Sequence, residues 1–363
     1  MSYIVVVSST KLTPAAITIL ADRDYYSNPG IGNSRGRFLD FGIPLTSAHK
    51  TGLGSSAALV TAVTVAVLSH YLSPTEVSIH SEQGRACLHN LAQAAHCAAQ
   101  GKIGSGFDVA AAVHGSCVYK RFSPSLLEDL GEFGSPGFAQ RLKSLVNEES
   151  QSKRWDTVID KANAIMPRGL KLLMCDVDCG SESVGMAKLV LKWRNEHPEE
   201  ASLLWATLQR GTNDLAQELQ RLTLSQSRVE YENLSNIILT IRSLVREMSV
   251  KAGVPIEPET QTNLLDACCR LPGVIGGVVP GAGGYDAVAL IVEDQKVQEN
   301  TVTSSSSSNP FVLQQLQEFL NHYQIEAKGE HGAGFGRVRL LNVQQESHGI
   351  KMESLSVCDG WVA

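Results

Sequence analysis

Three glycine-rich segments combine residue types that could handle phosphate groups. The first, Lys50–Ala58 (KTGLGSSAA), places two glycines and two serines before a long apolar stretch. Glycine lets the backbone approach a ligand closely, and the free N–H groups that begin a helix bind anions. The hydroxyls of Ser55 and Ser56 could cap the helix, bind phosphate or ligate Mg²⁺. No Gly-Lys-Ser/Thr closes the segment, so it is not a Walker A loop, and a capped glycine turn without function remains the alternative.

The second segment, Gly101–Asp108 (GKIGSGFD), places an acid directly after three glycines and before the apolar run VAAAV. A buried carboxylate needs a charged or hydrogen-bonded partner. Asp108 therefore either caps the next helix or faces a phosphate site beside a lysine such as Lys102.

The third segment is Pro280–Asp286 (PGAGGYD), which lies between two apolar strands. Taken alone it is a weak signal, because glycine-rich hairpins are common. A later run, Gly332–Gly336 (GAGFG), is predicted to be a loop, since no strand, loop and helix surround it.

The elements around these segments alternate between strand and helix patterns, which predicts an α+β protein. We expect a boundary that divides the chain into domains 1–165 and 166–363. Strands are predicted at 3–7, 16–20, 335–342 and from 170; helices are predicted at 56–71, 81–100, 183–194 and 310–321, with two more across 200–250.

Length and composition limit the possible classes of protein. A chain of 363 residues suggests about two hydrophobic cores. No apolar run reaches the roughly 18 residues of a membrane span, and the net charge of −6 with no basic stripe argues against nucleic acid. The eight cysteines form no CxxC pair, so we expect reduced thiols in a cytoplasmic protein and no structural zinc.

The order and spacing of the glycine segments resemble the phosphomevalonate kinases of the GHMP small-molecule kinase superfamily. The similar stretches are KTGLGSSAALVTA, NLAQAAHCAAQGKIGSGFDVAAAVHGS, CDVDCGSESVGMAKLVLKW, DRDYYS and VPIEPETQTNLLDACCRLPGVIGGVVPGAGGYDAVAL. The resemblance implies a two-domain fold with a ferredoxin-like C-terminal domain. It also implies transfer of the ATP γ-phosphoryl group to 5-phosphomevalonate, a step in the mevalonate route to isoprenoids and sterols.

The resemblance, together with the need to neutralise two polyanions, suggests the residues of the site. It makes Asp108 catalytic, with Lys50 beside it, and it makes Gly281–Gly284 close over bound phosphates or substrate. Mg²⁺ would bridge the ATP phosphates, with Ser56 as its preferred hydroxyl. The phosphate-binding residues would be Gly52, Leu53, Gly54, Ser55, Ser56 and Ala57, and the further substrate or phosphate candidates are Lys102, Ser105, His96, Arg85, Gly281, Ala282, Gly283 and Gly284.

Two departures from the family pattern stand out. The superfamily's first motif, a lysine followed by a Gly-Tyr hairpin, is not found, so we expect an N-terminal domain that is incomplete at its start. A mispredicted start codon, a shortened isoform and a true loss would look the same. In addition, His96 stands where many members carry a Glu that binds Mg²⁺. His96 either touches substrate or phosphate, or is a packed helix histidine.

Two other readings stay open at this point. A sister enzyme, mevalonate kinase or diphosphomevalonate decarboxylase, would share the loops, although the full sequences of the segments GSGFD and PGAGGYD disfavour both. A protein that keeps the fold without catalysis is favoured only by the missing first motif. The expected partners are small molecules, with no nucleic acid or membrane, and the chain is expected to be a monomer or a homodimer.

Overall fold

The computed structural model divides the chain into two compact units. The first comprises Met1–Ala164 and Gln345–Ala363, and the second comprises Ile165–Gln344. Assigning 166–363 to one domain therefore misplaced the end of the chain, because the last segment packs on α3 of the first unit. The structure describes residues 3–8, 16–22, 34–35, 37–40, 54–149, 154–162, 164–177, 183–225, 230–294, 312–323, 325–329, 332–341, 343 and 345–361.

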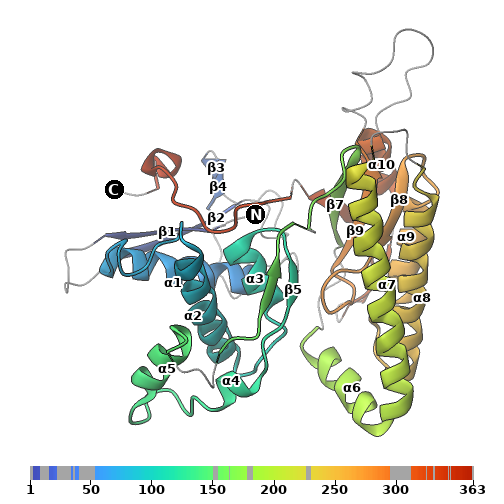
Figure 1. Ribbon diagram of the computed structural model, residues 1–363. Helices are drawn as coiled ribbons and strands as arrows, with labels where there is room; N and C mark the ends of the chain where they lie inside the picture. The colour runs from blue at the N-terminus through green and yellow to red at the C-terminus, as the bar shows by residue number, and fades with distance from the viewer. Residues whose placement is uncertain are drawn as a thin grey trace. The chain divides into compact units, whose positions relative to one another are not determined.

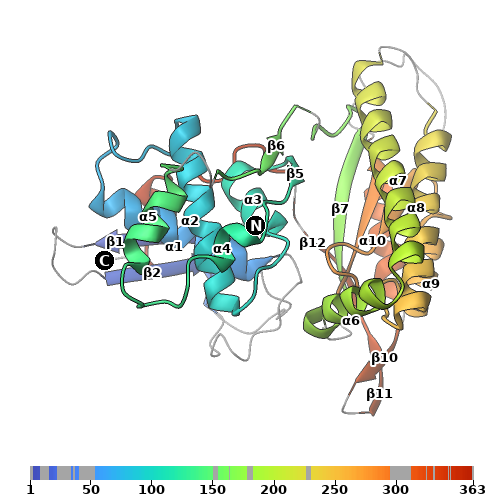
Figure 2. The same cartoon turned by 60° about the horizontal axis from the view of Figure 1, so that its bottom comes forward.

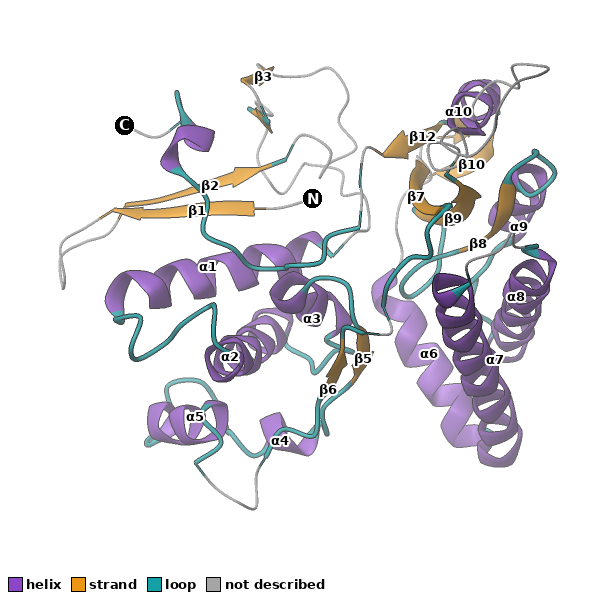
Figure 3. Ribbon diagram, turned by 45° about the horizontal axis from the view of Figure 1, so that its top comes forward, coloured by secondary structure: helices purple, strands orange, loops and turns teal. Residues whose placement is uncertain are grey.

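Three helices form the centre of the first unit (Figures 1 and 3). Helix α1 (Ser55–Tyr71) lies against both α2 (Glu82–Gln100) and strand β1 (Tyr3–Ser8), and α3 (Phe107–His114) contacts α1 and α2. The small buried side chains Ala57 and Ala92 let these helices approach closely. The remaining elements are β2 (Ala16–Ala21), which pairs antiparallel with β1, and β3 (Ser34–Arg35), β4 (Phe38–Leu39), β5 (Val118–Lys120), α4 (Ser125–Glu128), α5 (Phe138–Val146) and β6 (Val158–Asp160).

The second unit contains one four-stranded antiparallel sheet. Its strands β7 (Leu170–Val177), β8 (Val274–Val278), β9 (Ala287–Glu293) and β12 (Val338–Leu341) lie in the order β12-β7-β9-β8. In chain order this is fourth, first, third, second, which is the ferredoxin-like arrangement when α9 (Glu259–Cys268) and α10 (Val312–His322) are its two helices. The ferredoxin-like prediction is confirmed. The long insertion before α9 holds α6 (Ser183–Glu196), α7 (Pro198–Leu224) and α8 (Glu232–Ala252).

Alternating side chains give this sheet two covered faces. Leu173, Val288 and Leu290 pack with α9 and α10 in one core. Leu170 and Ile291 point the other way and pack with Leu234 and other residues of α7 and α8. No helix in the described part of the chain is long and apolar enough to cross a membrane.

The prediction of a loop at Gly332–Gly336 was wrong. This segment forms strand β11, which pairs antiparallel with β10 (Ile325–Gly329) as a hairpin that precedes β12 (Figure 2). A glycine-rich run has little strand propensity of its own, so the neighbouring strand decides its conformation.

The returning segment Gln345–Lys351 holds the C-terminal end of α3. The Ser116 N–H donates to the Glu346 carbonyl at 2.7 Å, and the Ile350 N–H donates to the Val113 carbonyl at 3.2 Å. The approach requires glycine: Gly349 has φ +69°, and a Cβ there would lie 2.3 Å from the Val113 carbonyl oxygen. The last part of the chain thus supports the helix that begins with Phe107 and Asp108.

We expect Gly349→Ala to lower the free energy of unfolding by about 3 kcal/mol or more, because left-handed strain adds to overlap with backbone atoms that must move. Gly134→Ala is the matched control. Gly134 has φ +82°, but a Cβ there would meet no atom of the described residues within 4 Å, so its substitution should cost about 1–2 kcal/mol. Urea unfolding of both variants measures the difference, and equal losses would show that the close approach is unimportant.

Candidate active site

The N-terminal ends of α1 and α3 meet in the first unit. Gly54 adopts a left-handed conformation, φ 70° and ψ 33°, and starts α1 with its carbonyl accepting the Ala58 N–H at 3.1 Å. A Cβ on Gly54 would lie 3.1 Å from the Cβ of Asp108, in the first turn of α3. The glycine therefore lets the serine-bearing helix start directly beside the acid. Two helix N-termini, each with unpaired N–H groups, then favour negative charge in one place.

Asp108 keeps its carboxylate close to its own helix. It is half-buried, and its Oδ1 accepts the Val109 N–H at 2.9 Å. The N-cap of α3 is Gly106, so Asp108 lies in the first turn and satisfies one N–H there instead of capping the helix. Its side chain has no salt-bridge partner among the described residues. A carboxylate in this position can both stabilise the helix start and orient a cation.

His96 reaches the same place from the last turns of α2. The residue is 6% exposed, and its Nε2 lies 3.2 Å from Ser56 Oγ and 2.9 Å from Gln100 Nε2. An amide nitrogen only donates, so this ring nitrogen accepts, and the Ser56 hydroxyl donates to it as well. Burial lowers the pKa of His96; the charge of Asp108 opposes this shift and that of Lys102 adds to it. His96 is therefore a neutral acceptor that leaves the lone pairs of Ser56 Oγ open.

The loop after α2 places its lysine at the same end. Gly101 ends α2 in a left-handed conformation, φ 62° and ψ 22°, and the Lys102 N–H donates to the Cys97 carbonyl at 3.2 Å. Lys102 and Ser105 are both exposed, and Lys102 is near enough to His96 to affect its pKa. These two residues are free to meet a ligand.

Arg85 is not brought to this cluster. It lies eleven residues before His96 on α2, which is about 16 Å along the helix axis. Its Nε donates to the Ile79 carbonyl at 2.7 Å, and its Nη1 donates to the His348 carbonyl at 2.8 Å. The guanidinium therefore ties α2 to the returning C-terminal segment, and the phosphate role considered for it has no support here. Lys50, Gly52 and Leu53 lie outside the described residues.

The third glycine segment belongs to the second unit, where Gly283 and Gly284 are held against the backbone of Ile256. The Gly284 N–H donates to the Ile256 carbonyl at 2.9 Å. A Cβ on Gly283 would lie 2.3 Å from that same oxygen, whereas a Cβ on Gly281 would meet no described atom within 4 Å. Gly281 and Ala282 are exposed and form the tip of a turn whose base is fixed.

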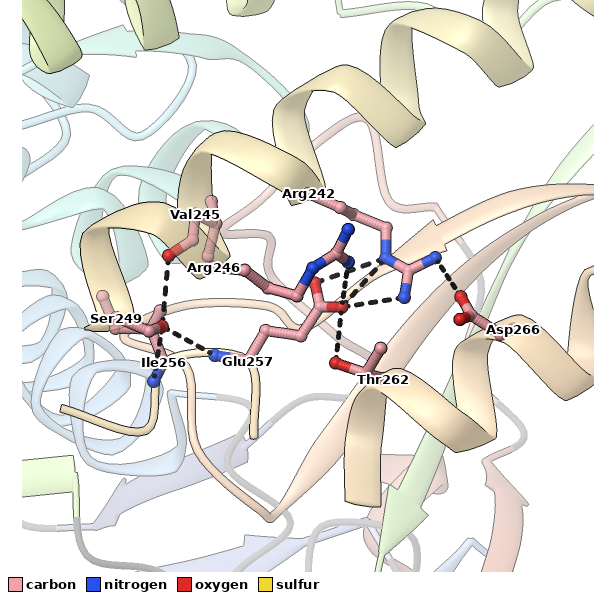
Figure 4. A network of polar contacts seen from close by, with 8 residues as sticks. All are labelled: Arg242, Val245, Arg246, Ser249, Ile256, Glu257, Thr262 and Asp266. Atoms are coloured by element: carbon pink, nitrogen blue, oxygen red, sulfur yellow. Dashed lines mark hydrogen bonds and ion pairs between the residues drawn. The ribbon is translucent and has the colours of Figure 1, made fainter. Parts of the chain in front are cut away.

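A buried ion network holds the segment on which this turn rests (Figure 4). The Glu257 carboxylate lies between two arginines of α8: Arg242 at 2.7 Å and Arg246 at 2.9 Å. The side chains of Arg242 and Glu257 are each 1% exposed. Arg242 also pairs with Asp266 of α9 at 2.8 Å. Glu257 follows Ile256 directly, so the network fixes the backbone that binds Gly284.

An acid that the sequence analysis did not select follows the turn. Burial raises the pKa of Asp286 to about 6, and the nearby charge of Asp176 adds to the shift. Asp286 can therefore gain a proton close to neutral pH.

Sequence reasoning also missed a polar stripe on α2. His89, Gln93, His96 and Gln100 follow the spacing i, i+4, i+7 and i+11, which places them on one helix face. That periodicity was visible in the sequence, but of these four residues the sequence analysis selected only His96. The structure shows hydrogen bonds from each of the four.

Comparison with known proteins defines the class to which this fold and site belong. Residues 28–116, which include the starts of α1 and α3, match the family "GHMP kinases N terminal domain". The crystal structure of a Lin0012 protein from Listeria innocua is similar, with a TM-score of 0.56 and 18% identity; the match covers 83% of this chain and 71% of that one. The chain therefore has the GHMP kinase fold.

Sequence similarity narrows the class to one family. The chain is 46% identical to phosphomevalonate kinase erg8 of Aspergillus fumigatus, over 100% of this chain and 73% of that protein. It is 47% identical to phosphomevalonate kinase ERG8 of Gibberella zeae, over 98% of this chain and 73% of that protein. The chain belongs to the phosphomevalonate kinase family.

The ion network predicts an asymmetric response to substitution. Arg242→Met should lower the free energy of unfolding by about 3–5 kcal/mol, because it leaves the Glu257 carboxylate buried beside a single, partly exposed arginine. Adding Glu257→Leu should recover most of that loss, since no buried charge then remains. Urea unfolding of the single and double variants measures this. A double variant less stable than the single one would contradict the explanation.

Proposed function

We propose that this chain is a phosphomevalonate kinase that transfers the γ-phosphoryl group of ATP to 5-phosphomevalonate, giving 5-diphosphomevalonate and ADP. The observation that carries the proposal is identity of 46% and 47% to two phosphomevalonate kinases along nearly the whole chain. The meeting of two helix N-termini at Gly54 and Asp108 supports it, because that geometry suits a polyphosphate.

The acceptor largely decides what the site must do. A phosphate monoester has a second pKa of about 6, so it is mostly dianionic at neutral pH and needs no strong base. Phosphoryl transfer then depends on positioning and on neutralising charge. The main difficulty is to bring two polyanions together.

We assign the neutralisation to groups around the start of α1. Gly52–Ala57 would bind the ATP phosphates through backbone N–H groups and the two serine hydroxyls. Lys102 and Lys50 would supply positive charge, with Ser105 beside them. Asp108 would orient a cation rather than remove a proton, since its charge and that of Lys102 both act on the neutral His96.

The residues present fit a bound Mg²⁺. The Ser56 hydroxyl donates to His96, so its oxygen keeps lone pairs for a hard cation, and Asp108 supplies carboxylate oxygen beside the same helix start. Ser56 is the preferred ligand. When bound, Mg²⁺ would neutralise charge on the ATP phosphates.

Gly281–Gly284 would contact phosphate or substrate through the exposed tip at Gly281 and Ala282. The clamped base argues for a preformed turn rather than one that folds over the ligand. We also propose a cytoplasmic location: the cysteines of the described residues are free thiols, as is usual in a reducing compartment. Cell fractionation would test this.

The activity is tested by coupled ADP release with ATP, Mg²⁺ and one of three acceptors: phosphomevalonate, mevalonate or diphosphomevalonate. We expect phosphomevalonate to give the highest kcat/KM by far. A preference for mevalonate, or phosphate release with diphosphomevalonate, would assign a sister activity. No turnover with any acceptor would leave a protein that keeps the fold without catalysis.

We expect Asp108→Asn to keep ATP binding but lose most of its turnover. The change is nearly isosteric, and the amide oxygen can still accept the Val109 N–H. It removes the charge that orients the cation, which should cost about 10²-fold or more in kcat. Steady-state kinetics and nucleotide titration separate the two effects. If the variant keeps half of the wild-type kcat, Asp108 only stabilises the start of the helix.

We expect Ser56→Ala to shift the Mg²⁺ dependence of the rate. Losing an oxygen ligand weakens binding of the metal, so the titration at fixed ATP should move to higher Mg²⁺. Ser55→Ala is the matched control, because Ser55 is the neighbouring hydroxyl on the same helix turn and is 8% exposed. An unchanged titration for Ser56→Ala, with a shift for Ser55→Ala, would move the metal role to Ser55.

A further inference from the structure

Besides His96, three polar side chains of α2 are buried. Asn90 is 3% exposed, His89 2% and Gln93 0%. Burying an amide or an imidazole costs free energy unless its polar atoms find partners. The rings of His114, Tyr119 and Trp155 lie around His89, and the burial of three polar groups here needs an explanation.

The three groups form a directed chain of hydrogen bonds. Asn90 Nδ2 donates to the Val146 carbonyl at 3.3 Å, and its Oδ1 lies 3.3 Å from His89 Nδ1. Gln93 Nε2 donates to His89 Nε2 at 3.1 Å and to the Gly106 carbonyl at 2.7 Å. Burial lowers the pKa of His89 to about 4, so the ring is neutral. With its proton on Nδ1, His89 donates to Asn90 Oδ1 and accepts from Gln93 at Nε2. The hydrogen bonds therefore fix the orientation of the Gln93 amide.

The chain ends at the start of the helix that carries Asp108. The Gly106 carbonyl also accepts the Ala110 N–H at 3.0 Å, the first bond of α3. Gly106 has φ +74°, and a Cβ there would lie 2.5 Å from Gln93 Oε1. The Gln93 amide thus packs directly on the turn two residues before Asp108.

Stability alone does not account for this glutamine. Its Oε1 is buried and has no hydrogen-bond partner in the described residues. An unsatisfied buried carbonyl costs about 1–3 kcal/mol, and an apolar side chain of the same shape would avoid that cost. The hydrogen bond that its Nε2 donates to the Gly106 carbonyl is the contact that can offset this cost.

We propose that Gln93 is a positioning residue, which holds the Gly106 turn so that Asp108 faces the start of α1. The inference rests on the proposed function, since Asp108 is the residue that it positions. Asn90 and His89 act one step further back by fixing the amide orientation.

The test is a double-variant cycle in the ADP-release assay. Gln93→Met keeps the length of the side chain and removes the donor. We expect kcat to fall by about three- to ten-fold with little change in KM for ATP, as one hydrogen bond implies. In the Asp108→Asn background the same substitution should cost almost nothing. Equal losses in both backgrounds would overturn the proposal, because Gln93 would then act on the fold in general.

A second readout does not depend on activity. Hydrogen exchange of a peptide covering 107–114 should be faster in Gln93→Met, because the first turn of α3 opens more easily. Thr61→Val is the matched control: Thr61 is 1% exposed, on α1, and its buried Oγ1 has no hydrogen-bond partner in the part of the chain that the structure describes. It should change neither exchange in 107–114 nor kcat. Unchanged exchange in Gln93→Met would overturn the proposal even if the wild-type chain showed no turnover.

Gln93→Leu serves if the methionine variant does not fold. It also removes the donor to Gly106 and places no polar group in a site that is 0% exposed, so the same loss in kcat and the same faster exchange are expected. If neither variant folds, Gln93 is structural and the proposal is wrong. If Asp108→Asn keeps its activity while Gln93→Met speeds exchange, the assignment of Asp108 has failed and the positioning of the turn has not.

Discussion

The first unit depends on the close approach of two helix starts, at Gly54 and at the turn before Asp108. A side chain on Gly54 would press on Asp108, and a side chain on Gly106 would overlap the Gln93 amide. The approach also needs small side chains where the helices touch, which the buried Ala57 and Ala92 provide. Because both helix starts favour negative charge, the anion that we propose there would replace the water that otherwise satisfies their N–H groups. The glycines and alanines that let the helices approach each other therefore also create the proposed anion site.

The two units fix their glycine turns by different physical means. In the first unit a neutral chain of amides and a histidine reaches the Gly106 carbonyl. In the second unit, ion pairs fix the turn: the Glu257 carboxylate lies between two arginines and holds the segment that binds Gly284. A neutral chain suits a place beside Asp108 and a polyanionic ligand, since it adds no charge to a site whose electrostatics matter. The ion network is buried in its own unit, where its charges balance one another.

Much of the fold could be predicted from periodicity and glycine position. The helices beginning at Ser55 and Glu82 and the strand at Leu170 follow directly from apolar patterns and caps. The return of Gln345–Lys351 to α3 could not, because a short polar segment carries no periodic signal and its place depends on contacts distant in sequence. At the site, the types of Asp108 and Ser56 indicated phosphate chemistry. Which cation lies beside them depends on helix geometry: Arg85 and Lys102 look equivalent in the sequence, but only Lys102 lies at the correct end of α2.

The sequence predicts that His96 stands where many superfamily members carry a Glu. The neutral state of His96 offers a reason why a histidine would suit that position. A second carboxylate beside Asp108 would place two like charges in a half-buried site, and one of them would be forced toward protonation. An imidazole avoids that repulsion. Held neutral by burial and by Lys102, it still accepts the Ser56 hydroxyl, so one carboxylate and one oriented hydroxyl remain to face a cation. Gln100 donates to the same ring nitrogen and keeps it an acceptor. An oriented Ser56 hydroxyl thus takes the place of a second carboxylate. The polar face of α2 orients the groups at both helix starts, through His96 at α1 and through Gln93 at α3.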